Sequence, residues 1–170
     1  MSSIRLYEET IYWRMIILLS IFFSGLMVGS VYFALSTNDE DAGIAILIMA
    51  IVLAVMATVM LTFSRLSITI TGDGVKVGFG RIIKRFPWDA ISGCYQDDAS
   101  AVRYGGYGIK GGKHKGKTRM VFNVTNAPRV VLVVKGAKFD EFVFSTKRPD
   151  EVIRIVTSQM KGSDDRPKGL

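Results

Sequence analysis

The chain has 170 residues, of which 49% are hydrophobic, and a formal net charge of +7. The charge is uneven, because residues 1–63 carry 2 Arg against 5 acids, whereas residues 64–170 carry 20 Lys and Arg against 10 acids. The single cysteine, Cys94, excludes an intrachain disulfide and favours a reducing compartment.

Two runs without a charged residue dominate the N-terminal part, at 15–38 and 42–64. Each exceeds the roughly 20 apolar residues that cross a bilayer core, and backbone polar groups in lipid must be paired within the segment. We therefore predict a transmembrane helical hairpin, residues 1–64, with spans at about 13–36 and 43–64. A cleaved signal peptide fits less well, because its apolar region is only about 7–15 residues long.

The charges that flank the two runs predict an orientation. Arg5 and Arg14 precede the first span and Arg65 follows the second, whereas the connecting segment 36–41 contains acids but no Lys or Arg. Because basic flanks remain in the cytoplasm, both termini are expected there. Residues 1–10 are interpreted as a polar lead with an interfacial turn of helix.

Small residues recur within both predicted spans, and such residues allow helices to pack closely. They could serve contact between the two spans or oligomerisation through the glycines, although glycine and alanine are also simply common in membrane helices. The residues concerned are Gly25, Gly29, Ala50, Ala54 and Ala57.

From residue 66 the apolar period changes to two, which is typical of half-buried strands. Seven strands are predicted, at 66–71, 75–79, 82–86, 91–95, 119–124, 130–134 and 139–144. Residues 104–110 could hold a further short strand, and 111–117 are predicted to be a flexible basic loop. An amphipathic helix follows, capped by Ser145 or Thr146, with an apolar face of Val152, Ile153, Ile155, Val156 and Met160. The tail 161–170 is predicted to be disordered.

Three segments carry a resemblance to a known family: Phe-Pro-Trp-Asp-Ala-Ile at 86–91, Tyr-Gly-Gly-Tyr-Gly-Ile-Lys at 104–110, and Phe-Ser-Thr-Lys-Arg-Pro-Asp-Glu at 144–151. With the order of strands and final helix, they resemble bacterial and archaeal membrane proteins that carry a pleckstrin-homology-like domain. The resemblance implies an α+β membrane protein, in which residues 65–160 form a partly open barrel of about seven strands capped by the C-terminal helix. It implies no agreed activity and no catalytic residues.

Few residues suggest a catalytic, nucleotide-binding or metal-binding role. Residues 111–118 match the letters of a phosphate-binding P-loop ending in Lys117 and Thr118, but that mechanism needs a helix where a strand is predicted. His114 is the only histidine, so no zinc set is expected, and a Cys94–His114 nucleophile pair has no support. Asp97 and Asp98 are interpreted as solvated turn residues. No cofactor or metal is expected.

Basic residues are the most informative feature of the predicted cytoplasmic part. An anionic leaflet attracts each by about 1 kcal/mol, although a solvated face without a partner remains an alternative. The residues are Arg81, Lys84, Arg85, Arg103, Lys110, Lys113, Lys115 and Lys117.

The sequence therefore favours a non-enzymatic, membrane-anchored module that binds anionic lipid headgroups or a protein partner at the cytoplasmic face. One alternative is an accessory or assembly subunit of a membrane complex, contacted through its spans, or a homo-oligomer. A remote alternative is a nucleotide-binding protein that uses Lys117 and Thr118. Nucleic acid is disfavoured as a partner because the chain is attached to a membrane.

Overall fold

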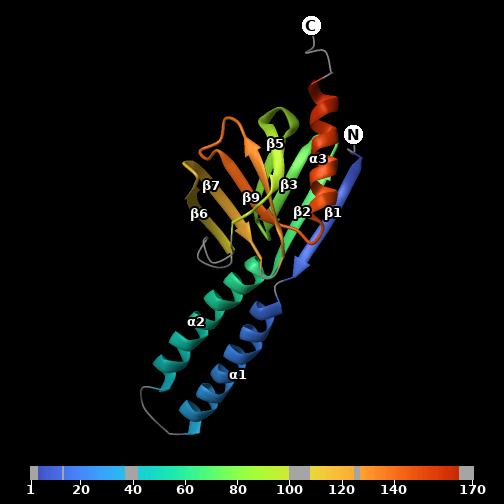
Figure 1. The fold of residues 1–170 in the computed structure, drawn as a ribbon. Coiled ribbons are helices and arrows are strands. Elements are labelled where there is room, and N and C mark those ends of the chain that lie inside the picture. The colour runs from blue at the N-terminus through green and yellow to red at the C-terminus, as the bar shows by residue number, and fades with distance from the viewer. Residues whose placement is uncertain (1–3, 13, 37–41, 100–107, 125–126, 165–170) are drawn as a thin grey trace. The chain divides into compact units, whose positions relative to one another are not determined.

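The structure is a computed structural model that describes residues 4–12, 14–36, 42–99, 108–124 and 127–164 (Figure 1). The chain divides into two compact units. The helical unit is Tyr12–Arg65, and the β unit combines the residues up to Ile11 with those from Leu66 onward.

Two helices make up the helical unit, α1 (Arg14–Ser36) and α2 (Ala42–Phe63). By length and composition, the segments Ile16–Ser36 and Gly43–Phe63 can each cross a membrane. The prediction of two long apolar helices is thus confirmed. The acidic segment Asp39, Glu40 and Asp41 lies outside the described residues.

The half-buried side of α2 carries methionines, whereas that of α1 also carries the small residues Ser20, Ser30 and Ala34. The half-buried positions of α2 include Ile46, Met49, Met56 and Met60, and the Ser20 hydroxyl donates to Met60 Sδ at 2.7 Å. These positions recur with the three- and four-residue spacing that keeps one helix face turned toward a partner. A Cβ built at Gly25 or Gly29 meets no atom within 4 Å, and the side chains of Ala50, Ala54 and Ala57 are exposed. Close approach at these small residues is therefore not seen within the hairpin.

The β unit contains two sheets. The first has the order β1-β2-β3-β4, with β1 (Arg5–Tyr12), β2 (Arg65–Thr71), β3 (Gly74–Phe79) and β4 (Ile82–Pro87). The second has the order β5-β8-β9-β7-β6, with β5 (Ile91–Gln96), β6 (Gly108–His114), β7 (Lys117–Asn123), β8 (Arg129–Val134) and β9 (Glu141–Ser145). β7 and β9 run parallel. No described strand of one sheet pairs with the other, so the sheets do not close into a barrel.

The seven predicted strands are confirmed as β2, β3, β4, β5, β7, β8 and β9. A short 3-10 helix, η1 (Trp88–Ala90), connects the two sheets, and the C-terminal helix is α3 (Pro149–Asp164). α3 packs against η1, β5 and β8, with Val152 and Val156 fully buried. It continues to Asp164, so the prediction of disorder from 161 onward is wrong for 161–164.

β1 replaces the expected interfacial turn of helix, and that prediction is wrong. Tyr7, Glu9 and Ile11 are buried on one side of the strand. The N–H of Gly72, after β2, donates to the oxygen of Ile4, before β1, so the two strands run in opposite directions (Figure 1). The alternation of buried and exposed residues in β1 could not be recognised from the sequence, because one of the buried positions is a glutamate.

A buried polar cluster explains why Glu9 is tolerated there. Its carboxylate accepts hydrogen bonds from the hydroxyl groups of Tyr7 at 2.7 Å and Thr146 at 2.6 Å, and from the N–H of Lys147 at 2.9 Å. The Arg148 guanidinium lies 4.9 Å from the centre of the Tyr7 ring. A buried carboxylate is stable only when it is hydrogen-bonded, so these contacts fix β1 to the turn before α3.

Phenylalanine rings join the two sheets through a shared core. The ring centroids of Phe79 in β3 and Phe122 in β7 are 5.6 Å apart, and those of Phe86 in β4 and Phe142 in β9 are 4.7 Å apart. Rings at these separations contribute pair contacts beyond the area that they bury. Both sheets therefore form one packed body, of which β1 is an edge.

We predict that the β unit requires β1. A chain in which a short Gly-Ser linker joins residue 12 to residue 65 should fold without the helices, because β1 and β2 are antiparallel neighbours. A chain that starts at residue 65 should lose at least about 3 kcal/mol of unfolding free energy, since it lacks the buried Tyr7 and Ile11. Urea unfolding followed by circular dichroism measures both chains. Equal stability of the two would contradict the role assigned to β1.

Candidate functional site

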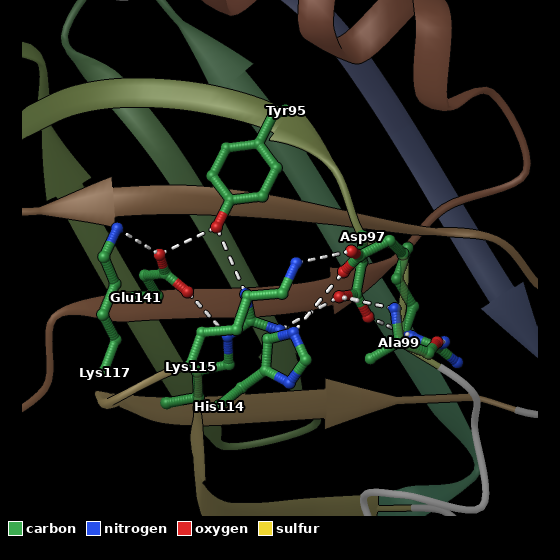
Figure 2. A network of polar contacts seen from close by, with 10 residues as sticks. Tyr95, Asp97, Ala99, His114, Lys115, Lys117 and Glu141 are labelled. Atoms are coloured by element: carbon green, nitrogen blue, oxygen red, sulfur yellow. Dashed lines mark hydrogen bonds and ion pairs between the residues drawn. The ribbon is translucent and has the colours of Figure 1, made fainter.

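Four charged side chains of the second sheet form a network of ion pairs. Figure 2 labels its two carboxylates, Asp97 and Glu141. Arg119 in β7 is the register partner of Glu141 in the parallel strand β9, and its Nε lies 2.6 Å from the Glu141 carboxylate. The other end of its guanidinium lies 3.1 Å from Asp97, which also accepts from Arg129 Nε at 2.8 Å. Arg129 also donates to the carbonyl oxygen of Ala99. The network therefore ties the end of β5 to β7, β8 and β9.

Burial sets the electrostatics of this network. The side chains of Asp97, Arg119 and Glu141 are no more than 3% exposed. Burial by itself raises the pKa of Glu141, but hydrogen bonds from Lys117, Tyr95 and Arg119 outweigh it, so the pKa lies below its ordinary value. Burial and the neighbouring Glu141 raise the pKa of Tyr95 to about 12. The carboxylate is thus ionised and the phenol neutral at physiological pH.

A cavity of about 210 Å³ opens beside the network, and we call it the His114 cavity. Its lining residues are Tyr95, Gln96, Asp98, His114, Lys115, Lys117, Arg119 and Glu141. Both donors and acceptors of hydrogen bonds thus face this space. A lining of this kind suits a small polar ligand better than an apolar one.

His114 is the unusual member of this lining. Its side chain is 4% exposed, and neither ring nitrogen has a hydrogen-bond partner among the residues that the structure describes. Nε2 lies 3.5 Å from the Asp98 carboxylate, which lies 2.8 Å from Lys115 Nζ (Figure 2). The hydrogen bond and charge of Lys115 lower the pKa of Asp98. The site can therefore hold and orient an ionised group beside a buried imidazole.

The structure corrects the predicted flexible loop at 111–117. β6 runs to His114 and β7 starts at Lys117, with only Lys115 and Gly116 between them, at φ of 49° and 81°. Positive φ at both central residues is the geometry of the tight turn that suits antiparallel strands. The glycines at 111 and 112 lie in an edge strand, which sequence reasoning interpreted as loop.

The predicted basic residues fall into different environments. Lys115 and Lys117 are engaged in ion pairs, with Asp98 and Glu141 respectively. The side chains of Arg81, Arg85 and Lys113 are exposed, and those of Lys84 and Lys110 are half-buried. Arg103 lies outside the described residues, as does the Tyr-Gly-Gly-Tyr part of segment 104–110.

Sequence reasoning missed the buried network. Asp97 was interpreted as a solvated turn residue, and that is wrong, because its side chain is fully buried; Asp98, at 62% exposed, does fit that interpretation. Arg119 and Glu141 each start an otherwise apolar strand segment, and this was the available signal. Cys94 is half-buried, and burial raises its pKa to about 12, so a thiolate nucleophile has no support.

The P-loop letters do not form a P-loop. Lys117 and Thr118 start β7, so a strand stands where the mechanism needs a helix. Among the described residues there is also no group of three or more His, Cys, Asp and Glu that could hold a metal ion.

No family model matches the chain, and neither the curated proteins nor the solved structures compared with it give a match.

We predict that Arg119 is essential for stability, whereas Lys117 is not, although both contact Glu141. Arg119→Met should cost about 3–5 kcal/mol of unfolding free energy, because it leaves buried carboxylates undercompensated. Lys117→Gln should cost less than about 1 kcal/mol, since its side chain is 52% exposed. Urea unfolding of the full chain in detergent micelles measures both variants, and equal losses would contradict the assignment.

Acid should weaken the same network. Because the folded-state pKa of Glu141 lies below 4.5, its stabilisation is present above that value and is lost as pH falls through the folded-state pKa. In the Glu141→Gln variant, the unfolding free energy measured by urea unfolding should therefore fall less steeply as the pH is lowered.

Proposed function

We propose that this chain is a non-enzymatic, membrane-anchored binding module. In this proposal α1 and α2 form a transmembrane hairpin, and the β unit lies on the cytoplasmic side with both termini. The order of strands followed by one helix supports the pleckstrin-homology-like fold that the resemblance implies. The ligand in this proposal is an anionic membrane surface, bound by exposed Lys and Arg of the β unit.

Chain connectivity supports attachment of the β unit to a membrane. β1 ends at Tyr12 and α1 begins at Arg14, while α2 ends at Phe63 and β2 begins at Arg65. One residue at each connection leaves little reach, so inserted helices would keep the β unit next to the lipid surface. A tether of this kind raises the local concentration of binding groups, so weak contacts suffice.

The observation that carries the ligand assignment is a pair of like charges on the β3–β4 hairpin. Lys76 and Arg85 are direct register partners, and both are exposed. Like charges directly opposite each other destabilise a sheet. Arg81 and Lys84 add two further charges to the same hairpin. An anionic surface would relieve this repulsion, whereas Lys115 and Lys117 are already compensated by Asp98 and Glu141.

A second candidate function is an accessory or assembly subunit of a membrane complex. It is favoured by Ala50 and Ala54, whose side chains are exposed on α2. Small residues on a free helix face allow a further membrane helix to approach closely. The partner in this case is another membrane protein or a second copy of the chain.

The topology is tested by accessibility labelling. In a Cys94→Ser background, single cysteines are placed at Asn38 and Ser163. In intact cells a membrane-impermeant maleimide should label position 38 and not position 163, because basic flanks stay in the cytoplasm. Labelling of position 163 from outside would reject this orientation.

Lipid binding is tested with the full chain in neutral nanodiscs mixed with vesicles that contain phosphatidylglycerol. The discs should co-float with the vesicles at low salt and separate at high salt, because screening shortens the reach of surface charges. Combined Arg81→Gln, Lys84→Gln and Arg85→Gln should reduce co-flotation strongly. The matched control, Lys135→Gln, Lys138→Gln and Lys147→Gln, removes the same charge from other exposed positions and should have a smaller effect. Binding that persists in high salt, or equal loss in both variants, would refute the assignment to this hairpin.

A further inference from the structure

The His114 cavity contains a buried polar group that the fold itself leaves unsatisfied. Both ring nitrogens of His114 lack hydrogen-bond partners among the described residues, although the side chain is almost fully buried and borders a space of about 210 Å³. Unpartnered buried polar groups are costly, so such a group indicates that something else completes the site.

The two carboxylates of the cavity are held very differently. Glu141 is 1% exposed and accepts from Tyr95, Lys117 and Arg119, so it is a fixed part of the sheet. Asp98 is 62% exposed and contacts Lys115 and His114 from the segment that follows β5. The Asp98 carboxylate can therefore move away from Lys115 and His114 without disturbing the buried network, whereas the Glu141 carboxylate cannot move without disturbing it.

We propose that the His114 cavity binds a dianionic phosphate group, which takes the place of the Asp98 carboxylate. Without Asp98, the lining has three cations, Lys115, Lys117 and Arg119, against one carboxylate, Glu141. The resulting excess of two positive charges matches a phosphomonoester. The group contacts Lys115 and Lys117 and accepts a hydrogen bond from His114, which gives one of the two unpartnered ring nitrogens a partner.

The entrance to the cavity suits exchange between Asp98 and a ligand. The side chains of Lys115, in the β6–β7 turn, and Lys117, at the start of β7, are 72% and 52% exposed, so both charged groups are within reach of solvent. Lys115 also holds a backbone conformation that normally favours glycine, at φ of 49°. A lysine at this place costs stability and supplies a charge, as expected at a binding turn.

This site is separate from the β3–β4 hairpin assigned to the membrane surface, and its ligand chemistry is narrower. The phosphate could belong to a small soluble phosphomonoester or to a lipid with a terminal phosphate. The chemistry is the same in both cases, and the experiment distinguishes the two sources.

His114 provides its own reporter, because it is the only histidine in the chain. We expect inorganic phosphate to shift the imidazole NMR signals of the histidine-labelled full chain saturably, in micelles of an uncharged, phosphate-free detergent. Ionic strength is held constant with chloride. Lys115→Gln should weaken phosphate binding roughly tenfold, as loss of a charge-assisted hydrogen bond does. Lys113→Gln, on the same hairpin but outside the cavity lining, is the matched control and should bind normally.

Asp98→Asn tests the exchange directly. It should tighten phosphate binding, because it removes the carboxylate that competes for Lys115; unchanged or weaker binding would contradict the exchange. The amide spectrum of each variant verifies that it is folded.

Two lipid samples identify the source and separate this proposal from membrane binding. Nanodiscs with phosphatidic acid should shift the His114 signals if the phosphate is carried by a lipid, whereas a response to inorganic phosphate alone indicates a soluble ligand. Phosphatidylglycerol lacks a monoester and should leave the signals unchanged, even where it binds the β3–β4 hairpin. No saturable shift with either phosphate source, or an equal shift with chloride, would overturn the proposal.

Discussion

The buried guanidinium group of Arg119 ties β5, β7 and β9 of the second sheet together. It contacts Asp97 after β5, Glu141 in β9 and the hydroxyl of Tyr95, while its own backbone lies in β7. Charges so deeply buried are tolerated only when each is paired and hydrogen-bonded. A shift of any one of these strands would leave a buried charge without its partner, so the network disfavours alternative strand pairings. Arg119, Glu141 and Tyr95 also line the His114 cavity, whose shape therefore depends on this pairing.

Cations of the β unit serve two different purposes. Lys117 and Arg119 are used internally, to neutralise Glu141, and Lys115 is held by Asp98. Lys76 and Arg85 face each other across β3 and β4 without such compensation in the contacts described. A net positive charge alone does not distinguish these cases. The ion pairs do, since a compensated cation attracts a distant surface less than an uncompensated one.

Much of the architecture was predictable from local patterns. The two helices follow from long charge-free runs. Seven strands follow from period-two alternation, which separates the buried face of a strand from its solvated face. β1 was missed because its buried positions include Glu9, whose partners Thr146 and Lys147 lie far along the chain. The start of β6 falls within the short strand considered at 104–110, but its continuation to His114 was missed because Gly111 and Gly112 carry no side chains from which to judge a period.

The candidate site was less predictable than the fold. Lys115 and Lys117 were noticed as basic residues, but their acidic partners belong to other segments and can be found only from the strand order. Asp97 and Asp98 are neighbours in sequence with opposite environments, one buried and one exposed. Adjacent residues of one type cannot be distinguished by composition. The unsatisfied nitrogens of His114 are likewise a property of the tertiary contacts and have no local signature.

The hairpin interrupts the β unit, with β1 before it and every other strand after it. A ribosome makes β1 first and then synthesises two apolar helices before β2 exists to receive it. At typical synthesis rates this takes on the order of several seconds. During that time β1 has no partner strand, and Tyr7 and Ile11 stay uncovered while the two apolar helices are made. The first sheet can therefore be completed only after both helices have been synthesised, so a folded β unit implies a complete hairpin between its first two strands.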